Sequence, residues 1–166
     1  MNSLKNQGDV IWSIANLLRG PYRPPQYRRV MIPLTVLRRL DCVLEPTQAK
    51  VVEYYKKLKG EKKYDAATIE KMVNNKFKLP FHNTSGFTFH KLLGDPDKLA
   101  ANLARFIGGF SPRARKILEK FKFEEEIEKL EEHNRLFEVI KAVAAVDLHP
   151  DRISNIAMGY LFEDLV

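Results

Sequence analysis

The sequence lacks the residues on which several classes of protein depend. It has a single cysteine among 166 residues, Cys42, so the chain alone can form neither an internal disulfide nor a cysteine-based zinc site. Its apolar runs fall well short of the roughly 20 residues that span a bilayer, and no signal peptide is recognisable. With 45% hydrophobic and 30% charged residues, the chain is neither a disordered tail nor a collagen-like fibre. We expect a folded domain with a buried thiol, located in the cytoplasm and without a membrane partner.

Motifs that carry catalysis or bind phosphate are also missing. Neither GxGxxG nor GxxxxGK[ST] occurs. The histidines show no HExxH spacing, and we interpret each as a turn or surface residue: His82, His90, His133 and His149. Gly108–Gly109 is typical of a helix end, and the acidic residues beside His149 are interpreted as a cap for the last helix. The residues therefore predict no catalytic residue, no cofactor site and no metal site.

Positive charge dominates but is unevenly distributed. The net charge is +7, and residues 1–63 carry 13 Lys and Arg against 5 Asp and Glu. Residues 64–123 carry 11 against 5, whereas residues 124–166 carry 4 against 11. A basic body with an acidic end indicates an anionic partner for the first two-thirds of the chain. A solubilising surface without a specific partner explains the charge equally well.

Helical patterns run through most of the chain. A first helix covers the N-terminal residues, and a second is predicted from about Gln26 to Leu44, kinked or split at Pro33. One long helix is predicted over residues 123–146. Further helices are predicted to start near Pro46, Asp65, Asp95 and Ser111, with a last one after Pro150. The sequence thus predicts a single all-α, bundle-like domain of about seven to eight helices over residues 1–166.

Residues 77–91 interrupt the helical pattern. Phenylalanines surround an Asn83–Gly86 turn, which predicts an aromatic loop or a short hairpin. Candidate residues of a protein interface come from this stretch and from the acidic EEEIEKLEE run: Phe87, Phe89, Glu124, Glu125 and Glu128. The acidic run is typical of the solvated face of a helix, and a basic partner is the alternative.

Two groups of basic residues are candidates for binding nucleic acid. The first comprises six arginines within 21 positions: Arg19, Arg23, Arg28, Arg29, Arg38 and Arg39. Guanidinium groups suit phosphate because they donate two parallel hydrogen bonds and stay charged. Pairing with acidic residues of the 124–132 stretch explains some of these arginines equally well. The second group is typical of sequence-independent electrostatic binding and comprises Lys56, Lys57, Lys59, Lys62 and Lys63.

Five segments of the sequence, taken in order, resemble one family. They are ANLLRG (15–20), YRRVMIPLTVLRRLD (27–41), FHNTSGFTFHKLLGDPDKLAANLARFIGGFSP (81–112), DLHPDRISN (147–155) and NIAMGYLFEDLV (155–166). Together they are similar to the N-terminal helical domain of the modification subunit (HsdM) of type I restriction–modification systems. The resemblance covers most of the chain. It places Arg19, Arg38 and Arg39 at motif positions.

The resemblance implies an activity that the composition does not. Members of the family are adenine-specific DNA methyltransferases that use S-adenosylmethionine and act on double-stranded DNA. Their partners are a specificity subunit, a second modification subunit and a restriction subunit. The family's cofactor loop and Asn-Pro-Pro-aromatic catalytic motif lie C-terminal to the last helix predicted here, and neither occurs in this sequence. We therefore expect a non-catalytic fragment without a cofactor, which a methyltransferase domain follows in the parent protein.

The resemblance also implies a role for the helical domain itself. In the family, this domain helps the assembled complex to close around DNA and contacts other subunits, so we expect a DNA-clamping and assembly domain. The alternative is a protein-interaction module that docks the specificity subunit without touching DNA. A stand-alone helical protein that binds DNA or RNA is a third interpretation, weakened by the absence of a recognisable nucleic-acid motif.

Overall fold

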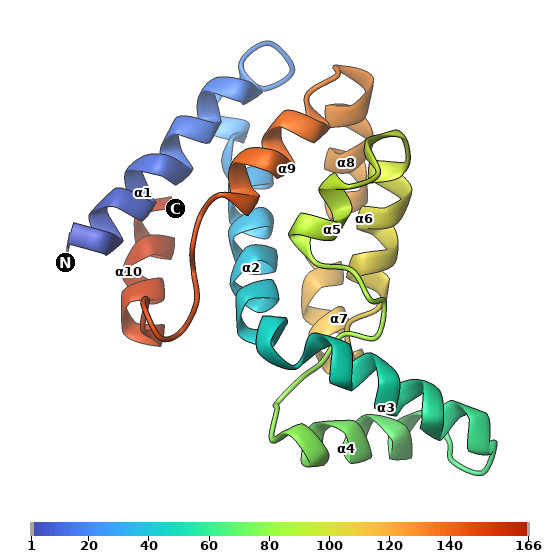
Figure 1. Cartoon of the computed structure of the whole chain (residues 1–166). Coiled ribbons are helices and arrows are strands. Elements are labelled where there is room, and N and C mark those ends of the chain that lie inside the picture. The colour runs from blue at the N-terminus through green and yellow to red at the C-terminus, as the bar shows by residue number, and fades with distance from the viewer. Residues whose placement is uncertain (1, 166) are drawn as a thin grey trace.

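The computed structural model describes residues 2–165, and the regular elements within them are helical (Figure 1). They comprise ten α-helices and four short 3₁₀ segments. The α-helices are α1 (Asn2–Ile14), α2 (Arg28–Leu44), α3 (Gln48–Glu61), α4 (Ala66–Phe77), α5 (Phe89–Leu93), α6 (Leu99–Gly108), α7 (Pro112–Glu119), α8 (Phe123–Glu132), α9 (Leu136–Ala144) and α10 (Asn155–Leu165). This confirms the predicted all-α fold. Among these helices, none combines the length and hydropathy needed to cross a membrane.

The structure corrects the prediction of one long helix over residues 123–146. That stretch forms α8 and α9, which are separated by a short break. Asn134 lies in the break with a φ of 57°, a left-handed conformation through which an α-helix cannot continue. By contrast, α2 is not split at Pro33 and runs unbroken from Arg28 to Leu44.

The aromatic stretch forms a loop and a short helix rather than a hairpin. The loop pairs with the rest of the chain through an isolated bridge between Asn83 and Phe110. Helix α5 follows it, and the side chain of Thr88 caps this helix by accepting a hydrogen bond from the Lys91 N–H at 3.1 Å. This additional helix and the break between α8 and α9 account for the larger number of helices.

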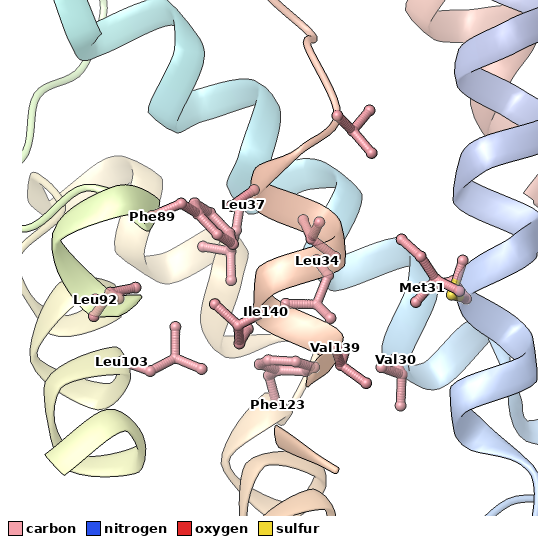
Figure 2. Close-up of a cluster of buried hydrophobic side chains, with 14 of the residues drawn as sticks. Val30, Met31, Leu34, Leu37, Phe89, Leu92, Leu103, Phe123, Val139 and Ile140 are labelled. Carbon is pink, nitrogen blue, oxygen red and sulfur yellow. The ribbon is translucent and has the colours of Figure 1, made fainter. Parts of the chain in front are cut away.

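The main core forms where α2 and α9 pack at the centre of the molecule. Figure 2 shows buried side chains of α2 facing those of α9, with Phe89 and Leu92 of α5 closing the core from the other side. Each such buried side chain stabilises the fold by about 1.5–3 kcal/mol. Helices α1 and α10 lie side by side on the opposite flank of α2 (Figure 1). Cys42 belongs to this core as predicted, and burial raises the pKa of its thiol.

Helices α3 and α4 form a hairpin that projects from the body (Figure 1). The hairpin has a small core of its own, made of Val51, Leu58, Ile69 and Val73. Asp65 caps α4 as predicted, since its Oδ1 accepts a hydrogen bond from the Thr68 N–H at 2.7 Å.

Three lysines adopt left-handed backbone conformations at helix ends. Lys62 and Lys78 follow the two hairpin helices, with φ angles of 56° and 54°. Lys122 precedes α8 with a φ of 51°. Glycine is the residue most often found in this conformation at the end of a helix.

Candidate nucleic-acid interface

Arg38 is buried within the domain. Its Nη1 lies 2.8 Å from Oδ2 of Asp41, and its Nε donates a hydrogen bond to the Val146 carbonyl at 2.8 Å. The guanidinium also lies 5.7 Å from the centre of the Phe89 ring. Burial raises the pKa of Asp41, while the Phe89 N–H and Arg38 oppose that rise. Arg38 therefore joins α2 to α5 and to the segment that follows α9.

Arg39 binds the segment between α9 and α10. Its Nη1 donates hydrogen bonds to the carbonyls of Leu148 and Ile153, both at 2.7 Å. Its Nη2 donates to Oδ1 of Asn155 at 2.9 Å. Burial lowers the pKa of Arg39. This arginine therefore fixes the path of the chain into α10.

These contacts correct the prediction that Arg38 and Arg39 bind nucleic acid. With exposures of only 6% and 8%, neither guanidinium is available to an external phosphate. Internal pairing accounts for both, although their partners are Asp41, Asn155 and main-chain carbonyls rather than the 124–132 stretch. The other four arginines are exposed: Arg19, Arg23, Arg28 and Arg29.

A hollow of about 420 Å³ lies beside the first turn of α2 and gathers basic residues from two parts of the chain. Its charged lining consists of Arg28, Arg29, Lys120, Lys122, Glu125 and Glu126. Among the described side chains, no ion pair includes Arg28 or Arg29. The two guanidinium groups are therefore available to an external anion.

Sequence reasoning did not identify Lys120 and Lys122 as site residues. Their only signal is their position in the KFKFEEE run, where they alternate with phenylalanines just before the acidic helix. Phe121 also lines the hollow, and Phe123 is buried in the core. This anchoring places the two lysines beside α2.

Tyr22 holds the loop that carries Arg23 against α8. Its side chain is 4% exposed, and its hydroxyl donates a hydrogen bond to Oε2 of Glu126 at 2.5 Å. The Lys129 ammonium lies 4.2 Å from the centre of its ring. Burial and the neighbouring Glu126 raise the pKa of Tyr22, so the hydroxyl remains protonated. A member of the acidic run thus positions the basic loop.

The second basic group occupies the α3–α4 hairpin. All five of its lysines are exposed, with Lys56, Lys57 and Lys59 on α3 and the other two in the turn that follows. The apolar side chains of the hairpin fill the contact between its two helices, and the lysines lie outside this contact. Lys71, Lys76 and Lys78 are exposed on the same hairpin and extend this patch.

The chain matches the family model described as the HsdM N-terminal domain over residues 8–143. The protein belongs to this family. It is therefore an N-terminal domain of the modification subunit of type I restriction–modification systems, as its motifs implied. The match includes both basic surfaces. No curated protein and no solved structure matches the chain.

In this HsdM N-terminal domain, the predicted protein-interface residues differ in accessibility. Phe89 is fully buried, with its ring 5.9 Å from that of Phe106, so its prediction as an interface residue is wrong. Phe87 is partly buried. The acidic candidates Glu124, Glu125 and Glu128 are exposed.

His82 of the HsdM domain, predicted to be a turn or surface residue, lies in the loop before α5 but is buried rather than at the surface. It is 3% exposed, and its Nδ1 lies 2.7 Å from Oδ1 of Asn74 on α4. Its backbone N–H donates to the Ser111 hydroxyl, and its carbonyl accepts from the Ser111 N–H at 2.8 Å. Burial lowers the pKa of His82 to about 4, which keeps the ring neutral at physiological pH. His82 therefore ties the hairpin to the body.

The acidic residues beside His149 do not cap α10. Asp147 pairs with Arg152, which lowers the pKa of the carboxyl, and also accepts a hydrogen bond from the His149 N–H at 3.0 Å. Ser154 supplies the cap instead, because its hydroxyl accepts from the Ala157 N–H at 3.1 Å.

Proposed function

We propose that this domain clamps double-stranded DNA within a type I modification enzyme and contributes to subunit assembly, without catalysing methyl transfer itself. The observation that carries the proposal is the hollow at the start of α2, where Arg28, Arg29, Lys120 and Lys122 converge. The hairpin lysines offer a second basic surface. Membership of the HsdM family supports a role in the modification subunit.

The chemistry of the hollow suits the DNA backbone rather than the bases. Arginine donates paired hydrogen bonds to phosphate oxygens, and lysine contributes mobile positive charge. Phosphate contacts position a protein on a duplex but carry no sequence information. Such a surface fits an enzyme in which a separate specificity subunit recognises the target sequence.

The family resemblance also supports a proposal about the parent protein. We propose that the parent protein is an adenine-specific methyltransferase in the cytoplasm that uses S-adenosylmethionine. Its proposed partners are the specificity subunit, a second modification subunit and the restriction subunit. The cofactor belongs to the methyltransferase domain of that enzyme, and we assign no cofactor site to this chain.

Fluorescence anisotropy with a non-specific duplex tests the DNA role. Binding should weaken linearly with the logarithm of salt concentration, with a slope of about −0.9 for each phosphate contact. The double variant Arg28→Glu/Arg29→Glu should bind more weakly and with a shallower slope. A matched control, Arg105→Glu/Lys141→Glu, reverses two exposed charges on α6 and α9, away from the hollow.

The control separates local contacts from net charge. The control variant should retain more of the affinity than the hollow variant. No binding at low salt, or an equal loss in the two variants, would reject the clamp.

A second candidate function is docking of the specificity subunit without DNA contact. The observation that favours it is on α10, where Ile156 and Tyr160 are 75% and 58% exposed and lie one turn apart. Changing both to serine should weaken copurification with the specificity subunit, whereas the Arg28/Arg29 reversal should not. Loss of copurification only in the arginine variant would exclude this alternative.

A further inference from the structure

A second cavity, of about 450 Å³, lies between the α3–α4 hairpin and the junction of α6 with α7. Figure 1 shows the hairpin beside the end of the body at which α7 begins. The cavity shares no lining residue with the basic hollow at α2. Its volume falls within the range of small-molecule sites.

Cations from both sides line this cavity. The hairpin contributes Lys59 and Lys62, and the body contributes Arg115. The Nη1 of Arg115 donates a hydrogen bond to the Gly108 carbonyl at 3.2 Å, and its Nε lies 3.9 Å from Oε1 of the exposed Glu119; both contacts hold the guanidinium at the wall. Helix α7 begins on the same wall, and the N–H groups of a first helical turn add positive potential. These positive groups favour a ligand that carries a phosphate group.

The cavity also contains two hydrogen-bond acceptors. His82 lines it and is 3% exposed. Since Asn74 occupies its Nδ1, the neutral ring offers the Nε2 lone pair to a ligand. Glu70 lines the cavity too, and its Oε2 is buried without a hydrogen-bond partner among the described residues. An unpaired buried carboxylate oxygen is costly, which points to a missing donor.

Two aromatic rings also line the cavity, beside the cations and the hydrogen-bond acceptors. Tyr55 and Tyr64 lie in the cavity wall on the hairpin side, and both are partly exposed. Tyrosine rings stack on nucleobases irrespective of sequence. Three cations, two aromatic rings and two hydrogen-bond acceptors together match one kind of ligand.

We propose that this cavity binds a mononucleotide whose base carries an exocyclic amino group. Lys59, Lys62 and Arg115 hold the phosphate, Tyr55 and Tyr64 contact the base, and Glu70 with His82 accepts hydrogen bonds from the amino group. A free nucleotide and an unpaired nucleotide of a DNA strand present the same chemistry. The site is separate from the hollow at α2, whereas Lys59 and Lys62 also belong to the basic surface of the hairpin.

Titration of the ¹⁵N-labelled chain with adenosine monophosphate tests the site. Saturable shifts are expected at the amides of Thr84, Gly108, Gly109 and Ser111, which line the cavity. Uridine monophosphate lacks an exocyclic amino group and should bind at least about tenfold more weakly. A short single DNA strand with a 5′-phosphate distinguishes the two sources of the ligand. Tighter binding of the strand than of the free nucleotide indicates an unpaired nucleotide of DNA, and weaker binding indicates a free nucleotide.

Three variants make the test specific. Gly108→Leu adds a bulky side chain at the cavity wall, where a Cβ meets nothing within 4 Å, and should abolish the shifts. Arg115→Gln should weaken phosphate binding about tenfold. Lys116→Gln changes an exposed lysine of α7 that does not line the cavity and should bind like the wild type.

Two outcomes would overturn the proposal. One is the absence of saturable shifts, or shifts that spread evenly over the lysine-rich surface. The other is unchanged affinity in a folded Gly108→Leu chain. Because this variant leaves the hollow at α2 intact, its duplex binding should persist, and failure of one proposal is distinguishable from failure of the other.

Discussion

At the scale of single residues, burial decides what each arginine can do. Arg28 and Arg39 are eleven residues apart, about three helical turns, so α2 places them on nearly the same side. Arg28 is exposed, yet Arg39 is covered by the chain between Leu148 and Asn155. The local pattern of α2 contains no information about that distant segment, which is why sequence reasoning left the two roles open.

Replacing Arg38 by methionine should destabilise the domain strongly. The change leaves the buried Asp41 carboxylate without its counter-charge, and we expect the free energy of unfolding to fall by about 3 kcal/mol. The matched change Arg28→Met, at an exposed position of the same helix, should alter it by no more than about 0.5 kcal/mol. Urea denaturation followed by circular dichroism measures both. Equal effects would contradict the internal role of Arg38.

His82 should make the domain less stable in mild acid. Burial lowers its pKa in the folded state from 6.5 to about 4, so the unfolded chain binds the proton more readily. The stability that the neutral ring confers is complete above pH 6.5 and is lost as the pH falls towards 4, by at most about 1.4 kcal/mol per pH unit.

Urea midpoints of the wild type and of His82→Gln, measured at pH 7, 6 and 5, test this pH dependence. The difference in urea midpoint between the wild type and His82→Gln should become smaller as the pH falls. Asp41, whose pKa burial raises, titrates in both chains, and its contribution therefore cancels. Parallel curves would show that His82 is not the titrating group.

At the scale of elements, the junction between α6 and α7 depends on close approach of the backbone. A Cβ at Gly109 would lie 2.6 Å from the Cβ of Ser85 and 2.9 Å from Oδ1 of Asn83. The junction is held there because the Gly109 carbonyl accepts a hydrogen bond from the Thr84 N–H at 2.8 Å. The sequence reading of Gly108–Gly109 as a helix end was right, but it missed this packing role.

The two neighbouring glycines should therefore respond oppositely to alanine. Gly109→Ala forces the 83–85 turn to move, and we expect it to lower the free energy of unfolding by about 1–3 kcal/mol. Gly108→Ala meets open space in a helical position and should leave stability unchanged or raise it by up to about 1 kcal/mol. Thermal and urea unfolding compare them directly, and a comparable loss in both would contradict the steric argument.

Helix boundaries were predictable where the chain marks them with specific residues. Asp65 before α4 and Ser111–Pro112 before α7 are such start signals. The break at Asn134 was missed because asparagine is tolerated within a helical pattern, and only its backbone conformation interrupts the helix. Helix α5, from Phe89 to Leu93, is too short to show a periodicity.

The sequence predicted that basic residues form the candidate site, but it did not predict where they come together in the folded domain. The exposed arginines at the start of α2 and the hairpin lysines follow from charge density along the chain. The approach of Lys120 and Lys122 to α2 depends on tertiary packing, which local charge does not encode. The same holds for the burial of Phe89, since an aromatic loop has no period that tells an inward ring from an outward one.

At the scale of the whole molecule, the domain presents two basic surfaces, the α2 hollow and the α3–α4 hairpin. If both contact one duplex, neutralising either should reduce the salt dependence of binding. We expect each of two double variants, Arg28→Gln/Arg29→Gln and Lys56→Gln/Lys57→Gln, to make the salt slope shallower by up to about 1.8. In the combined variant the two changes in slope should add. Arg105→Gln/Lys141→Gln is the control for net charge.

Anisotropy titrations at several salt concentrations give these slopes. A change confined to the hollow variant would limit the clamp to α2 and leave the hairpin to the nucleotide site. Slopes equal to that of the wild type in both variants would contradict phosphate contact by either surface.

Three lysines with left-handed backbone conformations, Lys62, Lys78 and Lys122, place positive charge at positions where glycine is the favoured residue. Lys122 lines the hollow and Lys62 lines the cavity, so at both sites a binding group occupies a strained position. Lys122→Gly should keep or raise the free energy of unfolding, by up to about 1 kcal/mol, while weakening duplex binding. A fall in stability with unchanged affinity would contradict this. Selection for thermal stability alone would therefore favour replacing these lysines by glycine. A thermostabilised version of this domain should first lose affinity for anions.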